Sequence, residues 1–421
     1  MRLYSDRIPN NPNHASWGRA IILIDMNAFF TSVEQLDYPE LQGIPIGVTN
    51  GWRGTTIITC SYEARAYGIK TGMRVREAKA LCSDFIQIPS RPYRYAQISS
   101  RIMEALTLFT PDVEIFSVDE AFLDVTRCQR LLGHPGYIAR LIKRKVHEVS
   151  GGLLCSIGVS GDKTVAKYAA KLKKPNGLTI IPPWESKQRL RNVPVTELCG
   201  IARGIGGFLE QRGVRFCGDM EHLPIGVLAK RFGNLGRRIW FMAQGLDPED
   251  VTTIVSPPKS IGHGKVMPPN TRDIKILRTF FLHMSEKVAQ RLRRYTLEAQ
   301  HFFIGLKTKH EWISKKLYTI APTNYGHDIY SLCLEFLGLE WDGEGSYQVQ
   351  VTAIDPHPID QQLKLFSSNN FRKRKNLCIV MDSINGRYGE FTLAPARLLY
   401  RSDMPNVIAP GWKPFGHRQT I

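Results

Sequence analysis

The chain has 421 residues, too many for one ordinary hydrophobic core, so several domains are expected. Lysine and arginine number 56 against 38 acidic residues, and this formal net charge of +18 is typical of a nucleic-acid-binding protein or of a merely soluble basic one. No segment approaches membrane-spanning length, and the eight cysteines show neither a disulfide framework nor zinc-ligand spacing.

The amino-terminal residues predict a polar leader followed by a buried strand. Residues 1–18 are rich in Pro and Asn and lack the hydrophobic core of a secretion signal, so we expect a soluble, cytoplasmic protein. Residues 20–24 are a short, β-branched apolar run, typical of a buried strand, and the run ends at Asp25. Residues 28–36 predict a helix.

Strands and helices alternate in the region that follows. Beyond a turn-rich stretch at 38–92, residues 94–110 carry their apolar side chains on one helical face. Residues 113–126 predict two short strands around an acidic corner, and a strand at 153–159 and a helix at 162–172 follow. This alternation indicates an α+β sheet domain with helices on one face.

The carboxy-terminal half predicts a helical region and then a second mixed domain. Residues 186–253 are helical in character and rich in glycine, and Ser256-Pro257-Pro258 is a linker. The elements expected beyond the linker are a helix at 274–294 and strands at 301–307 and 347–354.

Three carboxylates lie at the ends of predicted strands. Asp25 closes the first strand, and Asp119 and Glu120 lie at the turn between the next two. Adjacent carboxylates in an apolar setting stay ionised only with cations between them. Two Mg²⁺ ions about 3.5–4 Å apart would activate an attacking oxygen and stabilise a leaving one. For each acid taken alone, a surface turn or a helix N-cap is the better interpretation.

The longer sequences around these acids resemble signature motifs of the Y-family DNA polymerases. Residues 25–30 (DMNAFF) and 117–124 (SVDEAFLD) are similar to the two metal-site motifs of that family. Residues 61–68 (SYEARAYG) resemble its fingers motif, and 174–177 (KPNG) its motif at the end of the palm. The motifs follow the order of the family, and the likeness runs from about residue 20 to about residue 366.

The resemblance implies that Asp25, Asp119 and Glu120 are catalytic carboxylates that bind two Mg²⁺ ions, with the Met26 backbone carbonyl as a further ligand. Phe30 matches the steric gate, a ring that excludes a 2′-hydroxyl, although core packing is the alternative for it and the better interpretation for Phe29. An arginine suits triphosphate binding because its planar fork binds phosphate oxygens bidentately. The expected nucleotide-binding residues are Phe29, Phe30, Thr59, Tyr62, Arg65 and Lys174.

Three lysines recur every four residues and therefore share one helix face. Lys163 and Lys167 are expected to bind DNA, whereas a solvated position is the better interpretation for Lys171.

Asn27 stands where many family members have Asp. The matching position is not one of the metal carboxylates, so activity is not put in doubt. Asn there also occurs in the branch of the polymerase V catalytic subunit, which leaves the polymerase IV and polymerase V branches both open.

Residues 200–206 (GIARGIG) resemble a helix-hairpin-helix, in which Gly204 and Gly206 would let backbone amides approach a DNA phosphate, with a helix C-cap as the alternative. Between Lys259 and Lys316 there are thirteen basic and four acidic residues, which resembles the little-finger domain of the family. The DNA contacts expected there are Lys259, Ser260, Arg291, Arg293 and Arg294.

Residues 362–366 (QLKLF) resemble the segment by which bacterial polymerases bind the sliding clamp. Clamp contacts are expected from Gln362, Leu363, Leu365 and Phe366, and they would tether the enzyme to DNA. Residues 371–421 extend beyond the usual end of the family, and the sequence assigns them no role.

The resemblance implies an α+β, multidomain right-hand polymerase with a ferredoxin-like palm, small fingers, a helical thumb and an α/β little finger. The expected activity is low-fidelity, template-directed synthesis past damaged bases by a monomer that binds primer–template DNA, dNTP and the clamp. The predicted boundaries are a leader at 1–18, palm at 19–37 and 93–185, fingers at 38–92, thumb at 186–253, linker at 254–258, little finger at 259–357 and a tail at 358–421.

Three other functions compete with this hypothesis. A catalytically silent, clamp-bound adaptor of the same family would lose the metal carboxylates, but all three are present. A DNA-binding repair scaffold built on the hairpin motif leaves the acidic corner and the fingers motif unexplained. A nucleotide cyclase shares the metal chemistry but has no need for a thumb or a basic little finger.

Overall fold

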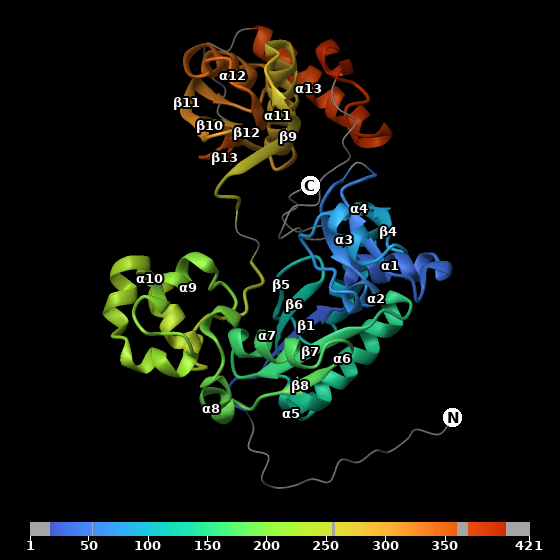
Figure 1. Cartoon of the computed structure of the whole chain (residues 1–421), viewed down its shortest axis with the longest axis vertical. Coiled ribbons are helices and arrows are strands. Elements are labelled where there is room, and N and C mark those ends of the chain that lie inside the picture. Colours follow the sequence, from blue (N-terminus) through green and yellow to red (C-terminus); the bar gives the residue numbers. More distant parts are fainter. Residues whose placement is uncertain (1–16, 53, 255–256, 360–368, 401–421) are drawn as a thin grey trace. The chain divides into compact units, whose positions relative to one another are not determined.

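The computed structural model describes residues 17–52, 54–254, 257–359 and 369–400, which fall into two compact units that meet in the chain at Val255 and Ser256 (Figure 1). Within these ranges, no helix is both long enough and apolar enough to cross a membrane.

The first unit is built on a five-stranded sheet with the order β5-β6-β1-β7-β8. The central strand β1 is antiparallel to both of its neighbours, and the edge strand β8 is parallel to β7. The strands are β1 (Ile21–Met26), β5 (Val113–Ile115), β6 (Glu120–Asp124), β7 (Cys155–Ser160) and β8 (Leu178–Ile180).

Helices cover both faces of this sheet. Alternate residues of β1 pack with α4 (Pro92–Leu106) and α6 (Pro135–Ser150) in one core, and the others pack against α7 (Lys163–Leu172). A Cβ on Gly158 would lie 2.0 Å from the Ala166 carbonyl oxygen, so glycine permits the close approach of α7. The prediction that helices cover one face only is therefore wrong.

The order β1, α4, β5, β6, α6, β7 along the chain is the βαββαβ order of ferredoxin-like folds, with β8 added at the edge. The strands and helices expected from periodicity are confirmed here, since 20–24 lies mainly within β1 and 28–36 within α1 (Phe29–Asp37) apart from its first residue. The helix expected at 94–110 ends earlier, at Leu106. The remaining short helix of this region is α5 (Gln129–Leu132).

A small sheet with the order β3-β2-β4 is inserted between α1 and α4. It has its own core, in which Ile57, Ala78 and Phe85 are buried. Its elements are η1 (Pro39–Leu41), β2 (Ile46–Thr49), β3 (Ile57–Cys60), α2 (Tyr62–Ala66), α3 (Val75–Leu81) and β4 (Ile86–Pro89).

A helical region follows the central sheet and packs around a separate apolar core, as expected for residues 186–243. Residues 246–254, after its last helix, form neither helix nor strand, so the prediction that the helical region extends to residue 253 is wrong. The helices are η2 (Pro183–Glu185), α8 (Ser186–Leu190), η3 (Val195–Glu197), α9 (Arg203–Glu210), η4 (Cys217–His222) and α10 (Ile225–Ala243), which is kinked at Gly233.

The second unit contains a four-stranded sheet with the order β11-β10-β12-β9, and the short strand β13 pairs with β10. The strands are β9 (Ile261–Thr271), β10 (Leu297–Thr308), β11 (Trp312–Thr323), β12 (Ser346–Ala353) and β13 (His357–Pro358). The predicted strands at 301–307 and 347–354 fall in β10 and, up to Ala353, in β12, which confirms them.

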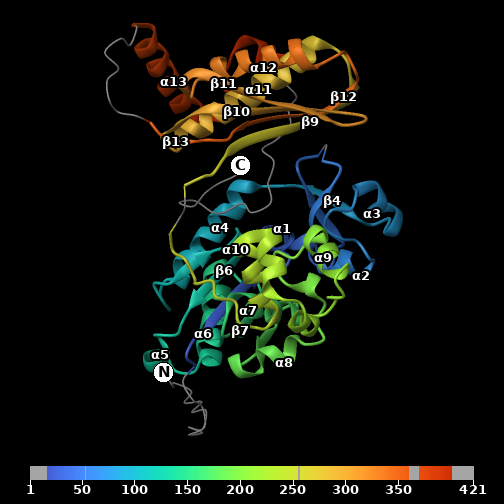
Figure 2. The same ribbon diagram turned by 90° about the vertical axis from the view of Figure 1, so that its left-hand side faces the viewer.

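Helices α11 (Ile274–Arg294) and α12 (Gly326–Glu340) pack together with the buried residues of β10 and β12 in one core (Figure 2). The helix predicted at 274–294 is confirmed with both boundaries. Two further helices, α13 (Asn369–Tyr388) and η5 (Ala396–Tyr400), belong to this unit, and Leu398 of η5 is buried in the same core. Part of the segment without a predicted role is therefore an integral part of the second unit.

Candidate active site

Strand pairing brings the three predicted metal carboxylates together. Asp25 near the end of β1 lies directly opposite Glu120 on β6. The backbone N–H of Met26 donates a 2.9 Å hydrogen bond to the Asp119 carbonyl oxygen. Residues far apart in the sequence thus meet at one end of the central sheet, as expected from their strand-end positions.

Asp25 is buried, and this burial raises its pKa to about 7. Lys174, whose Nζ lies 2.5 Å from Oδ1 of Asp25, acts in the opposite direction and favours the ionised form. Repulsion by Glu120 and Asp119 raises the pKa further. The site therefore holds Asp25 close to its point of ionisation and in need of a cation.

The other two carboxylates have partners of their own. The Ser117 hydroxyl donates a 2.6 Å hydrogen bond to Asp119, whose pKa is raised by burial. The Lys167 ammonium donates to both oxygens of Glu120, at 2.7 Å each. This pairing connects α7 to the acidic corner.

Among the described residues, no group of three or more His, Cys, Asp or Glu side chains forms a ready metal site. Two of the three carboxylates instead have lysine partners, Lys174 and Lys167. Burial and the neighbouring carboxylates raise the pKa of Asp25 and of Asp119, and all three carboxylates are the hard oxygen donors that a divalent cation such as Mg²⁺ prefers. The donor set therefore fits such an ion.

Asn27 connects β1 to the loop that carries Lys174. Its Oδ1 accepts a 2.7 Å hydrogen bond from the Asn176 backbone N–H, and its amide donates to the Ser156 hydroxyl at 2.9 Å. The sequence showed Asn27 only as a departure from the family pattern, and that departure was the one signal that could have drawn attention to it.

Phe29 and Phe30 are both buried at the start of α1. The Phe30 ring, 7% exposed, stacks on Tyr95 with 4.5 Å between the ring centroids. The Tyr95 hydroxyl in turn donates a 2.5 Å hydrogen bond to Glu34. Core packing thus fixes the Phe30 ring, and the predicted steric gate stays a prediction.

The predicted triphosphate ligands lie together on β3 and α2. The Arg65 guanidinium carbon is 4.6 Å from the centroid of the Tyr62 ring, and its Nε donates to the Cys60 carbonyl oxygen. The Tyr62 hydroxyl is buried, and no described residue hydrogen-bonds to it. Thr59 is half-buried on the preceding strand. A buried hydroxyl beside an exposed arginine suits an anionic oxygen ligand.

The three lysines of α7 all have acidic partners. Lys163 contacts Glu114 and Glu249, and Lys171 lies 3.8 Å from Glu197. Lys163 is only 4% exposed, so the structure favours a structural role for it over the predicted DNA contact. The solvated interpretation of Lys171 fits its exposed position.

The glycines of the predicted hairpin differ in their surroundings. Gly204 is exposed in the first turn of α9, where backbone amides point out of the helix. Gly206 is buried, and a Cβ there would lie 2.8 Å from the Thr196 methyl group. Gly204 therefore remains a candidate phosphate contact, whereas Gly206 permits the close packing of α9 on η3.

The predicted DNA contacts of the second unit fall into two classes. Lys259, Ser260 and Arg294 are exposed. Arg291 donates a hydrogen bond to the Gly262 carbonyl oxygen at 2.8 Å, and Arg293 binds both oxygens of Asp382 at 2.6 and 2.8 Å. These contacts favour structural roles for Arg291 and Arg293.

The predicted clamp-binding residues Gln362, Leu363, Leu365 and Phe366 lie outside the described residues.

Comparisons with known proteins show the family to which the chain belongs. Residues 24–171 match the family described as impB/mucB/samB, and residues 258–365 match the C-terminal domain of that family. The DNA polymerase IV of Moorella thermoacetica is 34% identical over 383 residues, which are 88% of this chain and 94% of the relative. The DNA polymerase IV of Desulfatibacillum aliphaticivorans is 33% identical over 90% of this chain and 96% of its own.

A solved structure described as a Y-family DNA polymerase chimera has the same fold. It superposes with a TM-score of 0.70 at 25% sequence identity and covers 81% of this chain and all of its own.

Proposed function

Because the chain belongs to the impB/mucB/samB family, the Y-family DNA polymerases, we propose that it extends a DNA primer along a template and past damaged template bases. The resemblance stated from the motifs is confirmed, and so is the α+β right-hand polymerase fold. The chain is a DNA-directed DNA polymerase whose substrates are primer–template DNA and dNTP.

The observation that carries the proposal is the meeting of Asp25, Asp119 and Glu120 at one end of the central sheet. These carboxylates, with the Met26 carbonyl as a further ligand, would hold two Mg²⁺ ions. When bound, such ions stabilise charge on the attacking and leaving oxygens of a phosphoryl transfer. The lysines now paired with Asp25 and Glu120 would become available to phosphates.

The incoming dNTP would bind beside the small inserted sheet. The unpartnered Tyr62 hydroxyl and the Arg65 guanidinium on the same ring support this placement, since both can donate to triphosphate oxygens. Thr59 and Lys174 would add donors on either side. Phe30 would act as the steric gate below the sugar, positioned by Tyr95.

The regions would take the roles that the sequence predicts. The central sheet would be the palm (19–37 and 93–185), the inserted sheet the fingers (38–92) and the helical region the thumb (186–253). Residues 259–357 of the second unit would be the little finger. Lys167, Gly204, Lys259, Ser260 and Arg294 remain the candidate DNA contacts. The segment 362–366 would bind the sliding clamp, and the enzyme would act as a monomer in the cytoplasm.

The catalytically silent adaptor is not favoured. Such a protein has no need for the metal carboxylates or for a buried hydroxyl beside an arginine, and this chain has both. The relatives favour the polymerase IV branch over the polymerase V branch, since the proteins of Moorella thermoacetica and Desulfatibacillum aliphaticivorans are both named DNA polymerase IV.

Single-nucleotide insertion with Tyr62→Phe tests the proposal, because this change removes only the hydroxyl. We expect KM for dNTP to rise about tenfold, the loss of one hydrogen bond to a charged group. Tyr67→Phe, on an exposed tyrosine at the end of the same helix, is the matched control and should match the wild type. Equal KM values for Tyr62→Phe and wild type would contradict the proposal that the Tyr62 hydroxyl binds the dNTP.

A further inference from the structure

The chain that leaves the last thumb helix folds back onto the central sheet. We call residues 245–252 the strap. The strap contains neither helix nor strand, and it leads to the linker before the second unit. It starts at Gly245, whose φ is +69° and where a Cβ would lie 2.6 Å from the Ser186 Cβ. Only glycine allows the chain to turn so close to α8.

Asp247 fixes the first half of the strap. Its side chain is fully buried, and both of its oxygens accept hydrogen bonds from Arg238 of α10 at 2.9 Å. The Thr164 hydroxyl of α7 donates to the same carboxylate at 2.6 Å. Asp247 therefore joins the thumb helix to the helix that carries Lys167.

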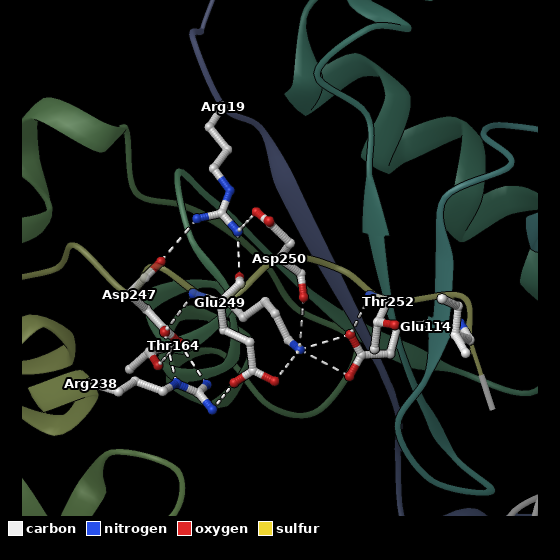
Figure 3. Close-up of polar contacts among 10 residues, drawn as sticks. Arg19, Glu114, Thr164, Arg238, Asp247, Glu249, Asp250 and Thr252 are labelled. Atoms are coloured by element: carbon white, nitrogen blue, oxygen red, sulfur yellow. Dashed lines mark hydrogen bonds and ion pairs between the residues drawn. The ribbon is translucent and has the colours of Figure 1, made fainter. Parts of the chain in front are cut away.

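Lys163 fixes the second half (Figure 3). Its ammonium contacts both oxygens of Glu114 on β5, at 2.9 and 2.7 Å, and the Glu249 carboxylate at 3.2 Å. Glu114 also accepts a 2.9 Å hydrogen bond from the Thr252 backbone N–H. Arg19, just before β1, donates to the backbone carbonyl oxygens of Asp247 and Glu249. Sheet, α7, thumb and strap thus share one network of charges.

We infer that this network is a clasp in which Lys163, Glu114 and Glu249 are positioning residues for DNA binding. The inference rests on the proposed polymerase function. The clasp holds the thumb against the palm and fixes the point where the linker to the second unit begins. It contains no group that contacts the reacting atoms, so it acts on DNA affinity rather than on the chemical step.

Release of the strap would about double the connection that leads to β9, because the strap (245–252) and residues 253–260 are equally long. If both units bind the same DNA, the effective concentration of the second unit falls as about the −3/2 power of this length, which gives a loss of affinity of about threefold. Loss of the Glu249 carboxylate leaves Lys163 paired with Glu114 alone and removes the ion pair that joins α7 to the strap.

The test is primer–template binding by Glu249→Gln, measured by fluorescence anisotropy with the full chain. Removal of an acidic charge strengthens binding to a polyanion by simple electrostatics. The clasp predicts the opposite, a dissociation constant raised about threefold, with the insertion rate at saturating DNA changed by less than about twofold. Glu221→Gln, which breaks a surface pair with Lys187 in the thumb, is the matched control and should not weaken binding.

A second pair of variants removes one hydrogen bond without changing charge. Thr252→Pro deletes the N–H that donates to Glu114, and Thr252→Ala keeps it. We expect weaker binding for Pro and wild-type binding for Ala. Wild-type affinity in both Glu249→Gln and Thr252→Pro would overturn the clasp. So would a loss confined to Lys163→Met, which would assign that lysine directly to DNA. Failure of the wild type to extend a primer would instead defeat the proposed function, because anisotropy needs no catalysis.

Discussion

The side-chain oxygen of Asn27 accepts a 2.7 Å hydrogen bond from the backbone N–H of Asn176. Asn27 lies two residues after Asp25 and directly after β1, and it thus holds the loop from which Lys174 reaches the Asp25 carboxylate at 2.5 Å. The Asn27 amide group also donates to Ser156, so both ends of the side chain are used. The position is a support for the active site and not a metal ligand.

Asn27→Ala should lower the rate of nucleotide insertion about tenfold, because the Asn176 backbone N–H loses its acceptor and Lys174 loses its fixed position. Asn27→Asp should stay close to wild type, since a carboxylate still accepts from Asn176 and the Ser156 hydroxyl can rotate to donate. Single-turnover insertion measures both. Equal rates for Ala and wild type would contradict the supporting role.

Phe30→Leu should weaken discrimination against ribonucleotides by up to about a hundredfold, the range over which a pocket rejects one small extra group. The measurement is the ratio of kcat/KM for a dNTP and the matching rNTP. Phe29→Leu is the control, because Phe29 is buried beside it and is expected only to pack. An unchanged ratio for Phe30→Leu would return Phe30 to the same packing role.

His263 on β9 makes the second unit sensitive to acid. Burial, helped by the nearby cations Lys287 and Arg291, lowers the pKa of His263 from 6.5 to about 3. Between these values the unfolded chain binds the proton and the folded one does not. The free energy of unfolding is therefore unaffected by His263 above pH 6.5. It falls as the pH drops below this value, by about 3 kcal/mol at about pH 4. His263→Phe should flatten this part of the unfolding profile, and an unchanged slope would contradict the assignment.

The pair of Arg293 and Asp382 should hold the carboxy-terminal segment on the second unit. Asp382→Ala leaves a largely buried guanidinium without its carboxylate, so we expect a loss of about 3 kcal/mol in the free energy of unfolding. Glu340→Ala breaks the more exposed pair with Lys315 and should cost less than about 1 kcal/mol. Denaturant unfolding measures the loss in both variants. Equal losses would contradict the claim that the buried pair holds the carboxy-terminal segment on the second unit.

Periodicity was enough to predict β1 and α11, whereas the resemblance of the surrounding motifs to the Y family decided the prediction that Asp25, Asp119 and Glu120 form one site. Periodicity also predicts the helix α7, but it does not show which face of the central sheet α7 covers. The decisive feature is Gly158, whose missing side chain admits the helix, and a lone glycine in a strand has several possible meanings.

The charged residues were predicted less well than the apolar ones. A lysine every four residues correctly places Lys163 and Lys167 on one face of α7, but spacing does not show that Glu114 and Glu249 cover the first of them. Those partners come from β5 and from the strap, far away in the sequence. The same holds for Arg293, whose partner Asp382 lies in a segment to which the sequence assigns no role.

The most direct test of the account is primer extension on an undamaged template with Mg²⁺ and dNTPs, wild type against Asp119→Ala with Glu120→Ala. We expect the wild type to extend the primer and the double variant, folded and still able to bind DNA, to add no nucleotide. Extension on templates with damaged bases would follow. Extension by the double variant at the wild-type rate, or none by a folded wild type that binds DNA, would contradict a polymerase active site at this end of the sheet.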